Sequence, residues 1–553
     1  MSRAVSVMLL ASLVLLGLGA RRSSPAGLAP GIPLLEAGSA EAEQDAWRLR
    51  LFALALVGGR AARHDRYLDA PQGRAVPWPP LFPAVLAAAA RQFGFRGRDA
   101  VELGALQDLE LLEFSARFLP LLGACAVVGA YLAARSLQGG PCADLAGLCA
   151  AALWALLPPV VFAERAGRID PHALTALISM GLVGATSFAL RAREEVDATL
   201  GGLAAGVLTG LGLACGVDAL VVILACTLAF GVCAWRARPG ARRALLLLLV
   251  AGAVTTSMGV GHETAWAEIL PIRVTWGARG GSQALRHWSV VGVGSAALVA
   301  LVAGWRVRAR FATLVLLLAG MGWAAMFDPG APAVALAVVL AAAVATADLT
   351  ERLRPGWRAL APLGLALVVL PALGFRPPDP LRPAAEEVGD LRAWREALGW
   401  MRDQDPAEGP WNQPAARPAG WILTAPSFAA SVAVGARWPV VCAAPPGLRA
   451  SAGRAARAAQ LLAGPADAAQ VEALREAGVW RVVVGPGMAT DPWLAQALQG
   501  AQDRTLFTAL ATSSAVPAGL ERLWPRSAGG APLSVWRVSA AGAPPTPANM
   551  RPR

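Results

Sequence analysis

Carboxylate and imidazole side chains, the groups that bind cations and move protons, stand in three separate segments of an otherwise apolar chain. Asp170 and His172 lie two residues apart in a short turn, where they could ligate one divalent cation. Glu268 stands among apolar neighbours, and a glutamate in such a membrane-proximal segment is costly unless it is paired. Asp45 closes an acidic stretch near the start of the chain. For Asp170 and His172, an ordinary loop aspartate and histidine remain the plain alternative.

The composition restricts the class of protein that carries these residues. Of the 553 residues, 56% are hydrophobic and 16% are charged, and the mean hydropathy is +0.50. These values favour a polytopic membrane protein over a cytosolic enzyme or a disordered chain. All 49 basic residues are arginines, which excludes chemistry that needs a lysine, such as a Schiff base or a Walker-type phosphate loop. The seven cysteines show no metal or redox spacing.

Apolar runs of the length that crosses a bilayer recur over the first two-thirds of the chain. The first run is followed by two arginines and predicts either a cleaved signal peptide or, as the following segments favour, a retained first helix. We expect about 11–13 spans in all, and the runs lie at residues 5–18, 116–134, 143–162, 173–190, 201–215, 219–235, 244–260, 290–305, 311–326, 331–347 and 359–373.

Arginines gather in alternate loops between these runs, and this pattern predicts the orientation of the chain. They are Arg191, Arg193, Arg236, Arg238, Arg242, Arg243, Arg306, Arg308, Arg310, Arg352, Arg354 and Arg358. By the positive-inside rule these loops are cytoplasmic. The opposite face then receives loop 21–115, the turn at 164–172, loop 261–288 and everything after residue 376. The net charge of +12 therefore reflects membrane orientation, and no nucleic-acid partner is expected.

The last third of the chain has a different pattern, in which short apolar strands alternate with helices. Strands are expected at 420–424, 439–443 and 479–484, and helices at 388–403, 452–462, 466–477 and 492–499. This alternation predicts a soluble α/β domain. We therefore expect a membrane domain at 1–375, which includes loops 21–115 and 261–288, and an extracytoplasmic α/β domain at 376–553. The Pro- and Ala-rich tail from Gly542 is expected to be disordered.

Several motifs carry a family resemblance through their order and spacing. They are Asp-Ala-Trp-Arg-Leu-Arg at 45–50, Asp-Arg-Tyr-Leu-Asp-Ala-Pro-Gln-Gly at 65–73, Val-Pro-Trp-Pro-Pro-Leu-Phe at 76–82, Ala-Gly-Arg-Ile-Asp-Pro-His at 166–172, Ala-Trp-Ala-Glu at 265–268, and the segments 437–441 and 472–484. They resemble motifs of the catalytic subunit of oligosaccharyltransferases. These are membrane enzymes of GT-C type that move a glycan from a polyprenyl carrier to asparagine. The run at 76–82 is the most specific of them.

The resemblance implies a GT-C fold and an inverting transfer, in which an acceptor nitrogen attacks the anomeric carbon and a polyprenyl phosphate or pyrophosphate leaves. It implies that Asp45, Asp170, His172 and Glu268 bind Mn²⁺ or Mg²⁺, and that Asp45 and Glu268 orient the acceptor amide. The expected partners are a polyprenyl-linked glycan, an acceptor protein or peptide, and the lipids of the cell inner membrane. Candidate contacts for the donor pyrophosphate are Arg165, Arg168 and Arg273. Arginines that merely face lipid headgroups are an equally good interpretation of these three.

One motif of the family is missing. Its Trp-Trp-Asp-Tyr-Gly sequence, which binds the hydroxyl group of the acceptor sequon, falls on Ala-Pro-Ser-Phe-Ala at 425–429. These residues offer no indole donor and no carboxylate, so the sequence assigns no acceptor-binding residue and indicates a divergent member. Two alternatives stay open: a GT-C transferase with a lipid, polymer or O-linked acceptor, and an inactive membrane scaffold. The scaffold hypothesis predicts that the four candidate ligands do not converge.

Overall fold

The computed structural model describes most of the helical and C-terminal segments. The described residues are 3–22, 40–58, 64–65, 74–76, 79–94, 105–157, 160–161, 164, 169–216, 219–235, 240–259, 332–352, 394, 396–403, 420–442, 452–499, 501, 504–525 and 533–539. The chain forms two compact units. We call Met1–Gly31, Pro77–Phe93 and Gln107–Arg382 the helical unit, and Ile32–Val76, Gly94–Leu106 and Pro383–Arg553 the mixed unit.

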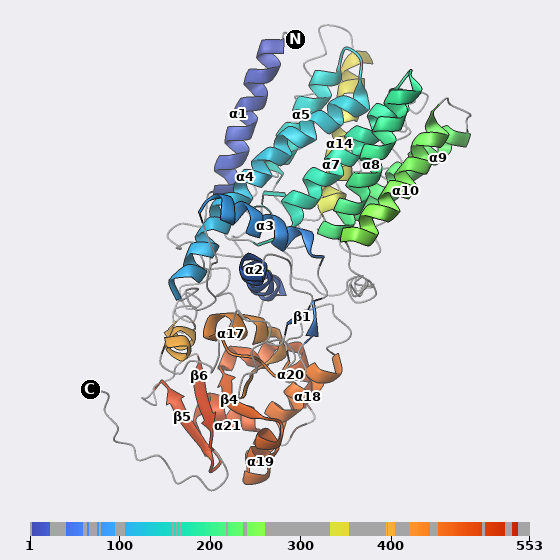
Figure 1. Cartoon of the computed structure of the whole chain (residues 1–553). Helices are drawn as coiled ribbons and strands as arrows, with labels where there is room; N and C mark the ends of the chain where they lie inside the picture. The colour runs from blue at the N-terminus through green and yellow to red at the C-terminus, as the bar shows by residue number, and fades with distance from the viewer. Residues whose placement is uncertain are drawn as a thin grey trace. The chain divides into compact units, whose positions relative to one another are not determined.

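The helical unit is built from long apolar helices (Figure 1). They are α1 (Arg3–Arg22), α3 (Leu81–Gln92), α4 (Ala105–Gln138), α5 (Ala143–Leu156), α7 (His172–Arg191), α8 (Glu195–Cys215), α9 (Ala219–Trp235), α10 (Ala241–Gly259) and α14 (Pro332–Arg352). Every predicted span that falls on described residues coincides with a helix over most of its described length. The spans expected at 290–305, 311–326 and 359–373 lie outside the described residues.

Within the described residues, four helices are long and apolar enough to cross a membrane: Ala4–Arg22, Arg117–Gln138, His172–Arg191 and Glu195–Cys215. Shorter apolar segments lie in α5, α9 and α14. Helix α5 ends at Leu156, before the end of the span predicted at 143–162. Pro158 and Pro159 follow it in the sequence, and proline cannot continue the hydrogen-bond ladder of a helix.

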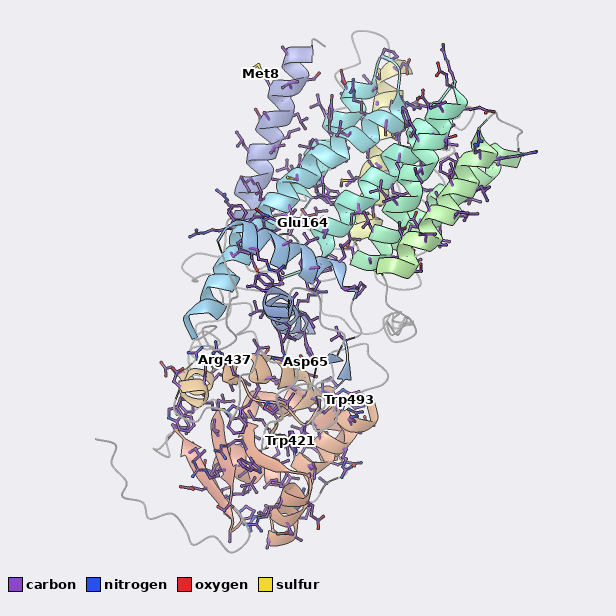
Figure 2. All side chains as sticks on the ribbon, viewed as in Figure 1. Met8, Asp65, Glu164, Trp421, Arg437 and Trp493 are labelled. Atoms are coloured by element: carbon purple, nitrogen blue, oxygen red, sulfur yellow. The ribbon has the colours of Figure 1, made fainter. Side chains whose placement is uncertain are left out.

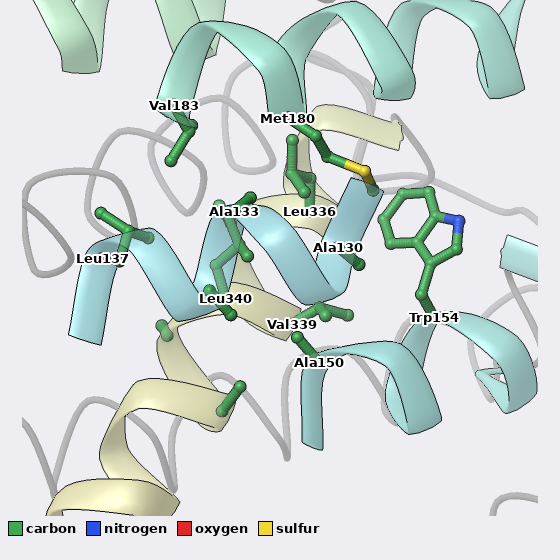
Figure 3. Packing of buried hydrophobic residues seen from close by; sticks show 14 of the residues in the cluster. Ala130, Ala133, Leu137, Ala150, Trp154, Met180, Val183, Leu336, Val339 and Leu340 are labelled. Atoms are coloured by element: carbon green, nitrogen blue, oxygen red, sulfur yellow. The ribbon is translucent and has the colours of Figure 1, made fainter. Parts of the chain in front are cut away.

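The core of the helical unit lies where α4, α5, α7 and α14 meet (Figure 3). Ala130 and Ala133 of α4 and Ala150 of α5 belong to one buried cluster, and small side chains there allow the helices to approach closely. Helix α14 is enclosed, because from Ala335 to Ala345 no residue is more than 5% exposed. Such a helix, apolar on all faces, is typical of the interior of a large helical protein.

Glycines spaced four residues apart bring α8 against α10. Gly202, Gly206 and Gly210 recur on one face of α8, and a Cβ atom on Gly206 would lie 2.8 Å from the carbonyl oxygen of Leu247 in α10. The hydroxyl group of Thr255 in α10 donates to the carbonyl oxygen of Gly206 at 3.3 Å. This is the small-residue packing that helices use where lipid replaces water.

The connections between helices divide into two groups at opposite ends of the helical unit. At one end, Arg191 donates to the carbonyl oxygen of Leu137, and Arg243 pairs with Glu195 at 3.5 Å. At the other end, the Thr175 hydroxyl donates to the Cys215 sulfur at 3.2 Å. Consecutive helices from α4 to α10 therefore run antiparallel. The described arginines of two predicted cytoplasmic loops share one end, and the start of α7 lies at the other.

The mixed unit contains a four-stranded sheet of order β3-β4-β6-β5, in which β3 and β4 are parallel and the other pairs are antiparallel. Its elements are α2 (Ala40–Gly58), β1 (His64–Asp65), β2 (Arg74–Ala75), β3 (Trp421–Leu423), η3 (Pro426–Phe428), α17 (Ala429–Ala436), α18 (Ala452–Ala463), α19 (Ala468–Glu476), β4 (Val479–Val484), η5 (Pro486–Thr490), α20 (Pro492–Gln499), α21 (Leu506–Thr512), β5 (Leu520–Trp524) and β6 (Ser534–Val538).

Most of the predicted elements of this unit are present. Strands β3 and β4 and helices α18, α19 and α20 confirm the expected alternation. The strand predicted at 439–443 is wrong in extent, because it is reduced to one bridge between Val440 and Ile422. Residues 32–76 group with the C-terminal segment, although the sequence assigned them to the membrane domain. The boundary at residue 375 stays a prediction, and the tail from Gly542 lies outside the described residues.

A leucine in place of Gly206 should force α8 and α10 apart. We expect Gly206→Leu to lower the free energy of unfolding by about 1–3 kcal/mol, the usual effect of overpacking. Gly184→Leu in α7 is the matched control, because a Cβ atom there meets no atom within 4 Å. Thermal unfolding in detergent measures both variants, and equal unfolding temperatures would contradict the packing described above.

Candidate functional site

Helix α2 carries Asp45, the first candidate ligand, in its N-terminal half. The side chain of Asp45 lies outside the described residues. Further along the helix, Trp47, Leu49 and Phe52 are no more than 1% exposed. An apolar helix surface buried in this way fixes the helix, and with it the backbone position of Asp45, within the mixed unit.

A buried ion pair joins α2 to the β1–β2 hairpin. Arg50 Nη2 donates to Asp65 Oδ1 at 2.6 Å, and Arg50 Nε donates to the other carboxylate oxygen. Arg50 is 1% exposed and Asp65 is fully buried. The fork geometry of guanidinium matches a carboxylate in this two-point contact. The two first motifs of the sequence resemblance, at 45–50 and 65–73, are therefore linked by a contact that the sequence did not predict.

Asp170 and His172 lie together at the start of α7. Asp170 Oδ1 accepts the backbone N–H of His172 at 3.1 Å and lies 3.1 Å from His172 Nδ1. Asp170 is 5% exposed. The negative charge is favourable at this place, because the first N–H groups of a helix have no partner within it. The carboxylate thus serves the helix terminus and at the same time faces the imidazole.

A second buried ion pair lies in the same unit. Arg21, at the end of α1, pairs with Glu164 at 2.6 Å, and both side chains are at most 1% exposed. Figure 2 shows Glu164 at the end of the helical unit where α1 ends. Burial raises the pKa of the Glu164 carboxyl, while the charges of Arg21 and His172 act against that shift by favouring the carboxylate.

The described residues supply two of the donor atoms that a divalent cation needs. A carboxylate oxygen and an imidazole nitrogen 3.1 Å apart are two ligands of the kind that Mn²⁺ accepts. The described part of the chain contains no cluster of three or more potential metal-ligating side chains. Glu268 and the candidate phosphate contacts Arg165, Arg168 and Arg273 all lie outside the described residues.

The segment at 425–429, where the acceptor motif of the family would fall, is a packed turn. Phe428 of η3 stacks on Trp394 with ring centroids 5.8 Å apart. The backbone N–H of Ser427 donates to Asp491 Oδ2 at 2.8 Å. The other oxygen of Asp491 accepts the N–H groups of Trp493 and Leu494 at the start of α20.

A carboxylate therefore does lie at this segment, but it comes from Asp491, a residue that the sequence analysis did not single out. It is 2% exposed and already accepts three backbone N–H groups. Its position before the first turn of α20 is the only sequence signal for it, because aspartate is a favoured helix cap. Its chemistry here is structural, since three charge-assisted hydrogen bonds occupy it.

These two units define the fold of the chain. Apolar helices of membrane-spanning length, joined to a C-terminal domain with a mixed sheet, form a fold of GT-C type. The predicted fold class is confirmed. The chain matches no protein-family model and none of the curated proteins compared with it.

Solved structures of the oligosaccharyltransferase of Archaeoglobus fulgidus share this fold. The form tethered to an acceptor peptide with the NVT sequon aligns at a TM-score of 0.65 and 14% identity, over 98% of this chain and 75% of that one. The complex with Zn and sulfate aligns at a TM-score of 0.62 and 16% identity, over 97% of this chain and 74% of that one. The complex of AglB with an inhibitory peptide and a dolichol-phosphate aligns at a TM-score of 0.62 and 14% identity, over 89% of this chain and 72% of that one. At these identities the likeness establishes the fold.

Removal of Arg50 should destabilise the mixed unit, because Asp65 would keep a buried charge without its partner. We expect Arg50→Gln to lower the free energy of unfolding by about 3–5 kcal/mol. Arg537→Gln is the control in the same unit, since its pair with Glu521 is half-exposed and 3.8 Å long and such pairs contribute about 0–1 kcal/mol. Chemical denaturation of both variants measures their free energies of unfolding. Similar losses in the two variants would contradict the stabilisation expected from the buried Arg50 pair.

Asp491→Ala should also destabilise the mixed unit, because three backbone N–H groups would lose their acceptor. We expect a loss of about 2–4 kcal/mol of unfolding free energy. Asp467→Ala is the matched control, because Asp467 caps α19 through one N–H, that of Gln470, at 2.8 Å, and loss of a single cap costs about 1 kcal/mol. Limited proteolysis under denaturant reports both values, and an unchanged Asp491→Ala protein would refute the cap.

Proposed function

We propose that this chain is a membrane glycosyltransferase that moves a glycan from a polyprenyl-linked donor to an acceptor, most simply an asparagine of a protein or peptide. The observation that carries the proposal is the pair of Asp170 and His172, 3.1 Å apart at the start of α7 in a chain of GT-C fold. Solved structures with this fold hold an acceptor peptide, a dolichol-phosphate, or Zn and sulfate. These ligands correspond to the acceptor, carrier and cation expected here.

In this proposal Asp170 and His172 hold a divalent cation, Mn²⁺ or Mg²⁺, together with Asp45 and Glu268. The cation, when bound, would stabilise the charge that develops on the leaving phosphate oxygens. Asp45 and Glu268 accept hydrogen bonds from the acceptor amide and orient its nitrogen. Guanidinium groups of Arg165, Arg168 and Arg273 are suited to the donor phosphates.

The bond changes balance without a further reagent. The acceptor nitrogen forms a bond to the anomeric carbon from the face opposite the leaving group, so the configuration inverts. The bond between that carbon and the phosphate oxygen breaks, and its electron pair leaves with the polyprenyl phosphate or pyrophosphate. The nitrogen releases one proton, and the carboxylates of Asp45 and Glu268 are the acceptors that we assign to it.

The packed turn at 425–429 supports a second candidate, a GT-C transferase that uses a lipid, polymer or O-linked acceptor. Asp491 is the carboxylate bonded to this turn, and three backbone N–H groups occupy it. A sequon hydroxyl would have to displace one of them. In this proposal the chain lies in the cell inner membrane, and the arginine-bearing loops support an orientation with the C-terminal domain outside the cytoplasm.

An in vitro transfer assay with a lipid-linked glycan and Mn²⁺ tests the proposal. We expect Asp170→Ala to slow transfer by at least about 100-fold, more than the loss expected for a residue that only orients a metal ligand. Asp197→Ala, in the first turn of α8, is the matched control and should transfer at the wild-type rate. Glycan found on lipid or polymer alone would favour the second candidate. No transfer by the wild type to any acceptor would leave the scaffold hypothesis.

A further inference from the structure

The contact between Arg21 and Glu164 involves more than two charges. Arg21 Nε donates to Glu164 Oε2 at 2.8 Å, while Nη2 donates to the carbonyl oxygen of Trp154 at 3.0 Å. Nη1 donates to the carbonyl oxygens of Gly17 at 3.1 Å and Ala155 at 3.3 Å. One guanidinium therefore binds its own helix α1, the last turn of α5 and the segment that leads to α7.

The last turn of α5 gains from this contact in two ways. The final carbonyl groups of a helix lack partners within it, and Arg21 supplies donors to two of them, at Trp154 and Ala155. A cation is also favourable at the negative end of the helix dipole. Arg21 is thus the C-terminal cap of a helix to which it does not belong.

Helix α4 has a glycine, Gly123, where it lies against the Arg21–Glu164 pair. A Cβ atom on Gly123 would lie 2.5 Å from Arg21 Nε and 2.8 Å from Glu164 Oε2. Gly17 is similarly close, since a Cβ atom there would lie 3.1 Å from Arg21 Nη1. The absence of a side chain at these two glycines leaves room for the pair against the backbone.

Glu164 also lies near the candidate site. It lies six positions before Asp170 in the sequence. Its backbone N–H donates to the carbonyl oxygen of Val160 at 3.1 Å. The charge of His172 acts on its carboxylate. The carboxylate of Glu164 therefore lies close enough to His172 for the imidazole charge to act on it.

We propose that the Arg21–Glu164 pair is a positioning clamp, which fixes the segment carrying Asp170 and His172 so that both side chains bind one divalent cation. Arg21 and Glu164 act through those two residues and are not themselves ligands. Apolar pairs of similar volume often stabilise a fold as well as buried ion pairs do, so we assign this pair a role in geometry beside its cap of α5. The inference rests on the proposed function.

The test compares Mn²⁺ binding, followed by electron paramagnetic resonance of the full chain in detergent, with thermal unfolding of the same samples. We expect Glu164→Gln and Arg21→Met to weaken Mn²⁺ binding about 10–100-fold, the range for residues that orient metal ligands. Both variants should also unfold at lower temperature. Arg21→Lys, which keeps the charge but lacks the fork, should recover part of the affinity.

The double variant Arg21→Leu with Glu164→Leu separates geometry from stability. It should unfold at a higher temperature than either single variant that leaves one charge, because no unpaired charge stays buried, and still bind Mn²⁺ about 10–100-fold more weakly. Wild-type affinity in this protein would overturn the clamp. Arg191→Leu is the control at the opposite end of the helical unit, where Arg191 bonds Leu137; it should lower stability and leave Mn²⁺ binding unchanged.

Failure of the clamp in the Mn²⁺-binding test can be told apart from failure of the proposed function in the transfer assay. A wild-type chain that binds no Mn²⁺ overturns the clamp, even if it transfers glycan, and the glycosyltransferase proposal then stands without it. A chain that binds Mn²⁺ and loses affinity in the double variant supports the clamp, even if the acceptor used in the assay is the wrong one.

Discussion

A guanidinium withdrawn from water is costly unless its charge and donors find partners, and in this chain a buried carboxylate meets that need beside both acidic motifs. In the helical unit Arg21 meets Glu164, and in the mixed unit Arg50 meets Asp65. Each arginine makes more than one hydrogen bond to its surroundings, so the position of the partner is fixed as well as its charge. The segments that carry Asp45 and Asp170 are thereby held by contacts that only charged groups of defined geometry can make.

The helical part of the fold could be predicted because its signal is local. A run of about 20 apolar residues identifies a membrane helix without knowledge of its neighbours, and α7 and α8 follow the predicted spans closely. In the mixed unit β5 and β6 were missed, since five-residue strands carry little pattern. Helix α17 was missed as well, because its small apolar residues show no helical periodicity.

The candidate site divides in the same way. Asp170 and His172 are near in sequence, so their spacing alone indicated a shared role, and they do lie together. Arg21 and Glu164 are 143 positions apart, and Asp491 is 64 positions from Ser427. No local pattern links such residues, because only the packing of whole helices brings them together. The contacts that hold the site were therefore beyond sequence reasoning, although the reactive groups were not.

The separation between Arg21 and its carboxylate has a consequence for biogenesis. Arg21 is synthesised 143 residues before Glu164. At about 5–20 residues per second, its carboxylate partner follows roughly 7–30 s later. An arginine near the end of a membrane helix can reach the interface, so during this interval the side chain is best placed when it extends to the headgroups. Only when the turn after α5 emerges can the guanidinium withdraw into the bundle, which makes the docking of the first helix a late event in assembly.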